Sequence, residues 1–440
     1  MSLTSSSPLR APVSATPMRF HSLAEWLSWQ EGLHFTAVDL GLDRCYEVAV
    51  RIGLLTPDFM LISIAGTNGK GSSAAMLDLI LRNAGYRVGN YTSPHLLRYN
   101  ERIRVDGVEI DDDTLCQSFN RIDQARADIS LTYFEFGTLA AIDFFHRSGV
   151  EIAILEVGLG GRLDAVNILD ADVALVCSID LDHENWLGHD REVIGAEKAG
   201  IFRAARPAIC SDLNPPSSII GHAAAIGSDL SLAGRDFGFQ IGEDSWSWRS
   251  GLSVMKDLPK PDRFNDSLVQ NAAGVLKILD VVSDRYPVDN KTVYESLQNF
   301  RLPGRFQRVP GKVSFVLDVA HNRQSAEVLA ENLGKLGPVR SNHIVIGMLK
   351  DKDHSAVFQA LSEFGDFWHL VTLDSERAAD SQMLAEELYK MGNSNNITLF
   401  EAIDTALQQV CAQARTGDRV VVTGSFLTVG AAIRWLNIED

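Results

Sequence analysis

The chain has 440 residues, of which 45% are hydrophobic and 22% are charged, and its formal net charge is −17 at pH 7. This length predicts two or three domains with a large core, and the composition is ordinary for a globular protein. The acidic charge argues against binding to nucleic-acid backbones, and no apolar stretch reaches the ~20 residues that span a membrane, so we expect neither partner.

Residues 2–17 are rich in Ser, Pro, Thr and Ala and contain no apolar core of a signal peptide. They predict a disordered tail over residues 1–19. Five cysteines are scattered without a CxxC pair, which favours free thiols in a reducing cytoplasm. We therefore expect a cytoplasmic protein, and we expect it to be a monomer.

Two helical patterns, at residues 21–33 and 40–54, come first along the chain. An apolar run over residues 59–65 then breaks into a glycine-rich turn, followed by an amphipathic helix. The turn carries Gly66, Thr67, Asn68, Gly69, Lys70, Gly71 and Ser72. Glycines let backbone N–H groups converge on phosphate oxygens, the helix N-terminus adds its dipole, and a lysine adds a point charge. This layout predicts a phosphate-binding loop for ATP.

The loop departs from the usual pattern in two places. Ile64 stands where the pattern has its first glycine, and Gly71 stands where it has Ser or Thr directly after the lysine. The alternative is an ordinary glycine-rich turn between a strand and a helix. The preceding strand and the following helix favour the phosphate loop.

Strands and helices alternate after the loop. We predict strands at residues 60–65, 87–92, 151–156 and 172–178, and helices at 72–83, 112–127, 136–147, 190–200, 267–281 and 291–299. Residues 206–256 predict short strands in an antiparallel patch. The near-continuous apolar runs at 152–155 and 173–176 are typical of a parallel sheet that is covered on both faces.

A break at residues 302–305 precedes a second alternating series. Its strands are predicted at 313–318, 342–347, 367–372 and 419–423, and its helices at 323–335, 354–363, 381–390 and 402–415. The predicted fold class is therefore α/β. A parallel-sheet, phosphate-loop ATPase domain (20–302) precedes a smaller Rossmann-like domain (303–440).

Polar side chains follow three predicted strands of the first domain. Ser93 comes after the strand that ends at Tyr91, Glu156 ends the next, and Asp180, Asp182 and His183 follow a third. Ligands of open α/β sheets bind beyond the carboxyl ends of the strands, so these side chains should face the phosphate loop. Carboxylate, hydroxyl and imidazole groups beside a triphosphate suit Mg²⁺, although a single strand-end residue is often only a cap or an ion-pair partner.

The second domain has Asp318 and His321 at a strand end, and Arg305 lies just past the break. Asp318 and His321 could contact nucleotide or substrate, and Arg305 could reach a phosphate held by the other domain. Alternatively, Asp318 caps the helix that starts near Arg323, and Arg305 only pins the linker.

These motifs resemble the bacterial bifunctional dihydrofolate synthase/folylpolyglutamate synthases, a family of the Mur ligase superfamily. The resemblance covers nearly the whole chain from about residue 20. It rests on residues 65–72, Thr92-Ser93-Pro94-His95, residues 155–164, Glu197-Lys198-Ala199-Gly200-Ile201, Pro303-Gly304-Arg305-Phe306 and Asp318-Val319-Ala320-His321-Asn322. The unusual loop spacing is the family's own pattern.

The resemblance implies an ATP-dependent ligase that adds L-glutamate to dihydropteroate and to reduced folates through an acyl phosphate. It implies Mg²⁺, with a monovalent cation such as K⁺ as a further candidate. The implied catalytic residues are Lys70, Lys198 (carbamylated in the superfamily) and His321. The implied metal ligands are Ser93, Glu156 and His183. Asn271, Arg305 and Asp318 join the loop in serving ATP or the incoming amino acid, and Asp39, Leu40, Gly41, Arg44, Phe134 and Asp164 bind the pterin substrate.

Two alternatives remain open. Another Mur-type ligase, acting on a cell-wall precursor, would have a similar loop and fold, but residues 39–44 and the Gly71-Ser72 variant favour folate. A nucleotide-dependent regulatory protein would also use the loop, but it would not need Lys198, Asp318 and His321.

Overall fold

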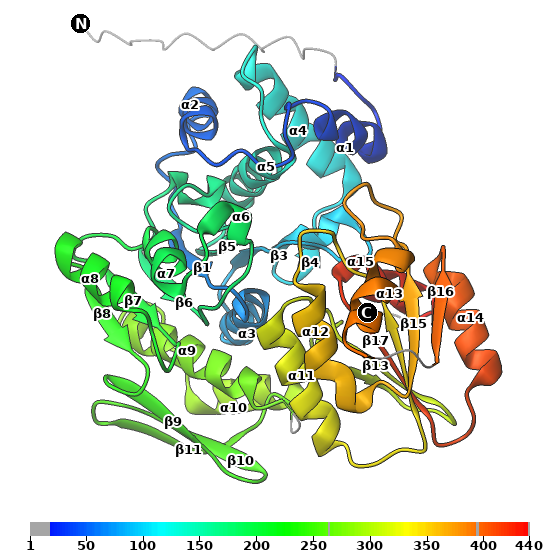
Figure 1. Ribbon diagram of the computed structural model, residues 1–440. Helices are drawn as coiled ribbons and strands as arrows, with labels where there is room; N and C mark the ends of the chain where they lie inside the picture. Colours follow the sequence, from blue (N-terminus) through cyan, green and yellow to red (C-terminus); the bar gives the residue numbers. More distant parts are fainter. Residues whose placement is uncertain (1–17, 263–264, 393–395, 439–440) are drawn as a thin grey trace, which may run out of the picture.

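The computed structural model describes residues 18–262, 265–392 and 396–438. Two domains, each built around its own sheet, lie against each other, the larger from the first part of the chain and the smaller from the last part (Figure 1). This is the predicted two-domain α/β architecture. In the described part of the chain, no helix is long and apolar enough to cross a membrane.

The larger domain is organised around an eight-stranded sheet of order β4-β3-β2-β5-β1-β6-β7-β8. The strands from β2 to β8 in that order run parallel, and β3 and β4 form an antiparallel edge. The strands are β1 (Met60–Ala65), β2 (Val88–Tyr91), β3 (Ile103–Val105), β4 (Val108–Glu109), β5 (Ile152–Glu156), β6 (Val173–Val176), β7 (Pro207–Cys210) and β8 (Asp229–Leu232). The buried central strands match the apolar runs that predicted them.

Helices cover both faces of this sheet, and each face has its own apolar core. One face carries α3 (Lys70–Asn83), α9 (Ser267–Val282) and α10 (Asn290–Asn299). The other face carries α1 (Leu23–Glu31), α2 (Asp43–Ile52), α4 (Asp112–Arg126), α5 (Tyr133–Ser148), α7 (Arg191–Ala199) and α8 (Ser217–Ile226). Short helices η1 (Tyr99–Arg102), η2 (Ala165–Ile168) and α6 (Glu184–Leu187) complete the domain. The phosphate loop connects the end of β1 to the start of α3, so it lies at the carboxyl end of the parallel strands.

The antiparallel patch predicted over residues 206–256 is only partly correct. Strands β7 and β8 join the large sheet in parallel, linked by α8. Only β9 (Phe237–Ile241), β10 (Ser245–Ser250) and β11 (Ser253–Pro259) form an antiparallel sheet. That sheet packs on α9, where Trp248 Nε1 donates to the carbonyl of Ala273 (3.1 Å). The β7 and β8 runs are short, and the edge strand β8 has polar residues, so their pattern did not distinguish the two arrangements.

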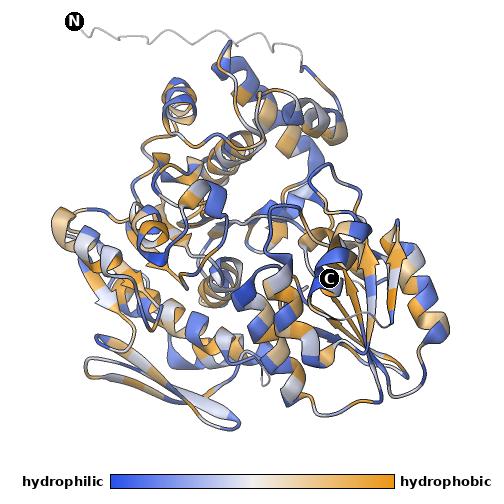
Figure 2. Cartoon of the chain, in the orientation of Figure 1, coloured by the Kyte–Doolittle hydropathy of each residue, from blue (hydrophilic) through white to orange (hydrophobic). Residues whose placement is uncertain are grey.

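The smaller domain has a six-stranded sheet of order β12-β13-β17-β14-β15-β16, parallel except for β12. Figure 2 shows its central strands as hydrophobic and its helices as mixed. The strands are β12 (Gln307–Val309), β13 (Ser314–Leu317), β14 (Asn342–Ile346), β15 (Phe367–Val371), β16 (Ile397–Phe400) and β17 (Arg419–Thr423). The helices are α11 (Arg323–Lys335), α12 (His354–Leu361), η3 (Ser362–Phe364), α13 (Ser381–Lys390), α14 (Ile403–Gln413) and α15 (Phe426–Trp435).

The predicted series of this domain is confirmed, and the structure adds β12, β16 and α15. The chain passes from α10 to β12 through the predicted break at residues 302–305; the exact domain boundaries stay a prediction. Residues 1–17 of the predicted tail lie outside the described residues. The prediction is wrong for Met18 and Arg19: Met18 packs on the core, and Arg19 Nε donates to Asp123 Oδ2 (2.7 Å).

Candidate active site

The phosphate loop joins β1 directly to α3. Gly69 adopts φ +89°, and a Cβ there would lie 2.4 Å from Asn271 Oδ1, so the position requires glycine on two counts. This contact also places Asn271 of α9 beside the loop, as expected. Thr67 anchors the loop to the end of β6, because its hydroxyl donates to the carbonyl of Asp180 (2.9 Å). The first N–H groups of α3 are thus held at the carboxyl end of the sheet.

Lys70 lies over this loop. Its Nζ donates to the carbonyls of Gly66 (2.9 Å) and Thr67 (3.2 Å). The next residue, Gly71, faces a carboxylate, since a Cβ on it would lie 3.5 Å from Glu156 Oε2. The glycine that departs from the usual loop pattern therefore leaves room for Glu156. Ser72 is buried in the first turn of α3.

Ser93 and Glu156 meet because β2 and β5 are neighbouring parallel strands. The Ser93 N–H donates to Glu156 Oε2 (3.0 Å). Glu156 is 4% exposed. Burial raises the pKa of its carboxyl group, although the nearby Lys70 and Arg305 oppose this effect. A bound cation would offset the cost of keeping this carboxylate ionised.

His183, the third predicted metal ligand, follows β6 but faces the smaller domain. Lys352 Nζ lies 3.4 Å from its Nε2 atom. Burial, followed by the charge of Lys352, lowers the pKa of His183 to about 4, so the imidazole is neutral, as a metal ligand must be. Among the described residues, no three His, Cys, Asp or Glu side chains gather as a metal site.

Of the three predicted metal ligands, Glu156 and His183 belong to these four residue types, whereas Ser93 contributes a hydroxyl. Hydroxyl, carboxylate and imidazole groups around a phosphate loop still suit Mg²⁺, which takes its remaining ligands from phosphate and water. The donor chemistry therefore fits the ion.

Lys198 is buried in α7, and burial, followed by the charge of Lys70, lowers the pKa of its amine to about 7. A substantial fraction of this lysine is therefore neutral near pH 7. A neutral amine is the form that reacts with carbon dioxide, so the environment suits the carbamylation expected from the resemblance.

The smaller domain places its predicted residues at the carboxyl end of β13. Asp318 accepts hydrogen bonds from the N–H groups of Phe306 (2.8 Å) and Ala320 (2.9 Å). The alternative role for Asp318 as a helix cap is wrong, because Asn322 caps α11. Arg305 is half-buried, and its guanidinium lies 4.8 Å from the centre of the Phe426 ring.

His321 has a defined orientation. Its Nδ1 atom donates to the carbonyl of Val319 (2.8 Å), since a carbonyl can only accept. Its Nε2 atom points at the larger domain and lies 3.6 Å from Asp182 Oδ2. The ring therefore stands at the interface between the two domains.

A cavity of about 380 Å³ lies between the two domains and joins several of these residues. The larger domain lines it with Gly71, Ser93 and Glu156, and the smaller domain and the interdomain break line it with Arg305 and Phe426. The grouping of phosphate loop, strand ends and Arg305 expected from the sequence is thus present in space, while the role of each residue stays a prediction.

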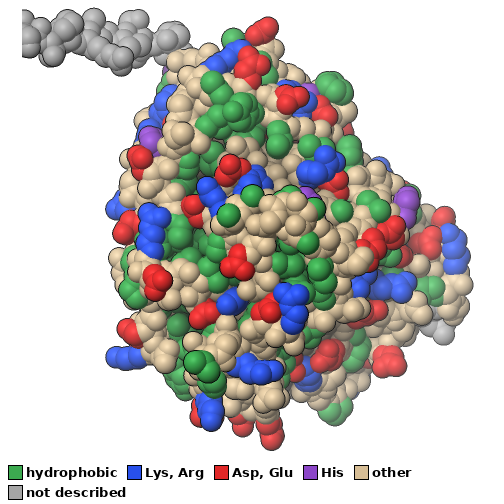
Figure 3. All heavy atoms as spheres, turned by 90° about the vertical axis from the view of Figure 1, so that its left-hand side faces the viewer, with side chains coloured by type: hydrophobic (Ala, Val, Ile, Leu, Met, Phe, Trp, Pro, Cys, Tyr) green, Lys and Arg blue, Asp and Glu red, His purple; other side chains and the backbone are tan. Residues whose placement is uncertain are grey.

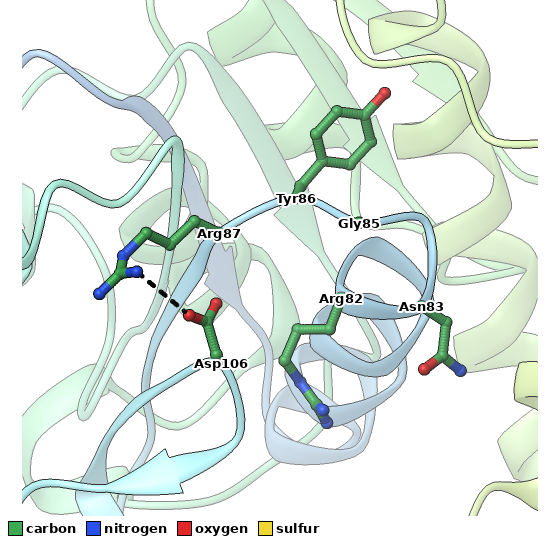
Figure 4. A pocket seen from close by; sticks show the side chains of 6 residues that line it. All are labelled: Arg82, Asn83, Gly85, Tyr86, Arg87 and Asp106. Carbon is green, nitrogen blue, oxygen red and sulfur yellow. Dashed lines mark ion pairs between the residues drawn. The ribbon is translucent and has the colours of Figure 1, made fainter.

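A second pocket, of about 440 Å³, lies at the far end of α3 (Figure 4). Its side chains diverge, and the ion pair drawn there joins Arg87 and Asp106 at 3.8 Å. It has no convergent polar groups and so offers no competing site.

The residues expected to bind the pterin lie on the other side of the large sheet. Asp39 accepts from Arg44 Nη1 (2.6 Å), and Arg44 Nη2 donates to Glu135 Oε1 (3.1 Å) at the start of α5. Leu40 and Gly41 between them are half-buried.

Phe134, next to Glu135, packs on the α-carbon of Gly158, where a Cβ would lie 2.6 Å from Phe134 Cζ. Asp164 is buried, accepts from the N–H groups of Leu159 (2.8 Å) and Val166 (3.1 Å), and has its pKa raised to about 7 by burial. The segment at residues 39–44 and the start of α5 therefore form one connected unit.

Lys352, Asn322 and Gln324 were absent from the predicted site, although each contacts the larger domain. Lys352 donates to Asp182 Oδ1 (2.6 Å), and Asn68 of the phosphate loop donates to Asn322 (3.2 Å) and Gln324 (2.7 Å). Lys352 follows the end of β14, so the rule that ligands lie beyond strand ends could have found it. Its partner depends on how the domains meet, which no local pattern shows.

The family model "Mur ligase, glutamate ligase domain" matches residues 304–426. The dihydrofolate synthase/folylpolyglutamate synthase of Escherichia coli K12 is 41% identical over 417 residues, 95% of this chain and 96% of that protein. The chain belongs to the dihydrofolate synthase/folylpolyglutamate synthase family. The Haemophilus influenzae protein of the same name is 39% identical, over 95% of this chain and 98% of that protein.

Solved structures of this family are also similar to this chain over nearly its whole length. E. coli FolC in complex with DHPP and ADP superposes with a TM-score of 0.90 at 41% identity, covering 96% of this chain and 99% of that one. A bifunctional folylpolyglutamate synthase/dihydrofolate synthase with Mn, AMPPNP and L-glutamate bound gives a TM-score of 0.88 at 42% identity, covering 96% and 100%. The family predicted from the sequence motifs is confirmed.

Proposed function

We propose that this chain is an ATP-dependent ligase that adds L-glutamate to dihydropteroate and to reduced folates. The observation that carries the proposal is the interdomain cavity, where the phosphate loop, Ser93, Glu156 and Arg305 face one space in a member of this family. The relatives carry dihydrofolate synthase and folylpolyglutamate synthase names, which favours folate over a cell-wall precursor. A regulatory protein would not need the second set of residues on the smaller domain.

The reaction must first activate a carboxylate, because oxide is a poor leaving group. A carboxylate oxygen of the acceptor attacks the γ-phosphorus of ATP, and ADP departs, leaving an acyl phosphate. The amine of glutamate attacks the acyl carbon and loses a proton, and the tetrahedral intermediate expels phosphate to leave an amide. Water must be kept out of this step, since hydrolysis of the acyl phosphate wastes ATP, and a cavity between two domains that can close on it would meet that need.

Each side chain has a proposed part. Lys70 and the loop N–H groups bind the β- and γ-phosphates and stabilise the charge that develops on them. Ser93, Glu156 and His183 would hold Mg²⁺, which supplies further charge neutralisation when bound. Arg305 and His321, from the break and the smaller domain, position the incoming glutamate and the acyl phosphate.

Finer features of the proposal follow from the family and the composition. ATP and Mg²⁺ are the cofactors, in line with relatives solved with ADP, AMPPNP or Mn, and a monovalent cation such as K⁺ is a further candidate. We propose a cytoplasmic monomer without nucleic-acid or membrane partners. The net charge of −17 favours the absence of nucleic acid, and Figure 3 shows acidic and basic side chains interspersed on the visible face.

The test is ADP release measured with each acceptor. The protein should release ADP only when L-glutamate and an acceptor are both present, and it should accept dihydropteroate and tetrahydrofolate. Mass analysis of the product should show one added glutamyl unit. ADP release with a muramyl peptide precursor, and none with either pterin, would instead favour the cell-wall alternative.

Glu156→Gln should raise the Mg²⁺ concentration needed for half-maximal turnover. The change keeps the size and the hydrogen bond from Ser93 but removes the charge that a cation would neutralise. A metal titration of the initial rate at saturating ATP measures the effect. Glu101→Gln is the matched control, because this carboxylate lines the same cavity but is bound by the backbone of Leu96 and Leu97. An unchanged metal requirement in Glu156→Gln would remove Glu156 from the metal site.

Replacing both Asp39 and Arg44 by Ala should impair dihydropteroate more than tetrahydrofolate. Adding a glutamate moves the reacting carboxylate away from the ring, so the two acceptors place their pterins differently. Loss of charged hydrogen bonds of this kind costs about 1.5–3 kcal/mol, so kcat/KM for dihydropteroate should fall roughly 10–100-fold.

Arg51→Ala is the control for this variant, because Arg51 lies on the same helix and bonds to the carbonyl of Ala125 (2.8 Å). Equal losses on both acceptors in the double variant would show that residues 39–44 only support the fold.

A further inference from the structure

Asp182 is buried between the two domains, and none of the roles described so far uses it. Its side chain is 9% exposed. Its Oδ1 atom accepts from Lys352 Nζ (2.6 Å), and its Oδ2 atom accepts from Asn322 Nδ2 (3.0 Å). His321 Nε2 lies 3.6 Å from the same Oδ2. One carboxylate of the larger domain thus contacts three side chains of the smaller domain.

The Asp182–Lys352 pair is shielded from water, since the Lys352 side chain is only 5% exposed. Lys352 Nζ lies 2.6 Å from Asp182 Oδ1, so the two groups form a close ion pair across the interface. Removing one partner of such a pair leaves a buried charge without compensation, whereas an exposed ion pair contributes little.

The same interface reaches the phosphate loop. The Asn68 and Asn322 amides bond to each other in both directions (3.2 and 3.1 Å), and Asn68 also donates to Gln324 (2.7 Å). Asn322 thus contacts the loop and Asp182 at once. Because Asn322 follows His321 directly and caps α11, fixing Asn322 also fixes the position of the His321 ring.

We infer that Asp182 is a positioning residue that holds the smaller domain, through Lys352 and Asn322, in the arrangement that presents His321 to the reacting groups. This inference rests on the proposed ligase function. The phosphates of the nucleotide are expected to bind the loop of the larger domain, so ADP affinity should depend less on this contact than the use of glutamate does. The use of glutamate and turnover need groups from both domains, so both depend on the contact made by Asp182.

The test is Asp182→Asn, which keeps the size but places an NH₂ group or a neutral oxygen against Lys352 and Asn322. Truncating a buried, hydrogen-bonded charge pair costs enough to lower kcat/KM for L-glutamate roughly 30-fold or more. Nucleotide affinity, measured by calorimetry with ADP, should fall much less than kcat/KM for L-glutamate. Lys352→Met should give the same pattern, and the double variant should be no worse than either single variant, because both remove one interaction.

Lys335→Met is the matched control. Lys335 of α11 pairs with Asp266 of the larger domain (3.0 Å), also across the interface, but both side chains are about one third exposed. This variant should leave both kcat/KM for L-glutamate and the affinity for ADP unchanged. Spin labels on α4 and α14 of the full chain should report a broader interdomain distance distribution in Asp182→Asn than in the unmodified protein and in Lys335→Met.

The distance and calorimetric measurements do not require turnover, so they separate this inference from the proposed function. Absence of glutamate-dependent ADP release in the unmodified protein would overturn the function alone. Unchanged kinetics and unchanged distances in Asp182→Asn would overturn the positioning role, as would additive losses in the double variant. A loss of ADP affinity as large as the loss in kcat/KM for L-glutamate would also overturn it, because Asp182 would then mainly support the phosphate loop.

Discussion

Lys70→Ala should lower turnover by about 10²–10³-fold, the usual effect of losing one preorganised electrostatic contact to a reacting group. The ammonium lies over the phosphate loop and donates to the carbonyls of Gly66 and Thr67 on that loop. In the proposed function, Lys70 stabilises charge on the transferred phosphoryl group rather than a packed core. The fold should therefore persist, and single-turnover ADP formation together with the melting temperature measures both effects.

Arg82→Ala is the control for this experiment. Arg82 lies near the other end of α3 and pairs with Asp78 (2.9 Å), far from the loop. It should leave turnover unchanged. A folded Lys70→Ala protein with normal turnover would show that the loop does not bind the reacting phosphates, and an unfolded one would show that Lys70 is needed for the fold.

The core of the fold could be predicted because its strands are buried on both faces. Residues 152–155 and 173–176 are near-continuous apolar runs, and both became central parallel strands, β5 and β6. The strands at the edges of the large sheet were harder to predict. The β3–β4 hairpin and β8 are short and half polar, so their pairing depends on neighbours that a local pattern does not contain.

The grouping of site residues followed from one topological rule. Residues at the carboxyl ends of neighbouring parallel strands must meet, and Ser93 and Glu156 do so because β2 pairs with β5. The rule says nothing about how two separate sheets face each other. Asp182 and Lys352 are 170 residues apart on different domains, so their contact could not be inferred from spacing.

Lys198→Ala should lower turnover by about 10²–10³-fold, and a short carboxylic acid such as propionate should restore part of it. The reason is the carbamate proposed at this residue. Burial and Lys70 lower the pKa of the amine to about 7, so it is increasingly neutral as the pH rises through 7 and can then attack carbon dioxide. The product is an anionic group beside Lys70, where a second ammonium would be repelled. An added carboxylate can take the place of the carbamate in the truncated variant.

Rescue separates a lost anion from a lost structural contact. Initial rates of ADP formation in Lys198→Ala should rise with propionate and saturate, whereas the unmodified protein and Lys70→Ala should not respond. Rates of the unmodified protein should also fall after carbon dioxide is stripped at pH 6 and recover on adding bicarbonate at pH 8, because only the neutral amine can be carbamylated again. A Lys198→Ala protein that keeps full activity would contradict the assignment. So would an inactive protein that no carboxylic acid rescues, because Lys198 would then act through its amine or its packing alone.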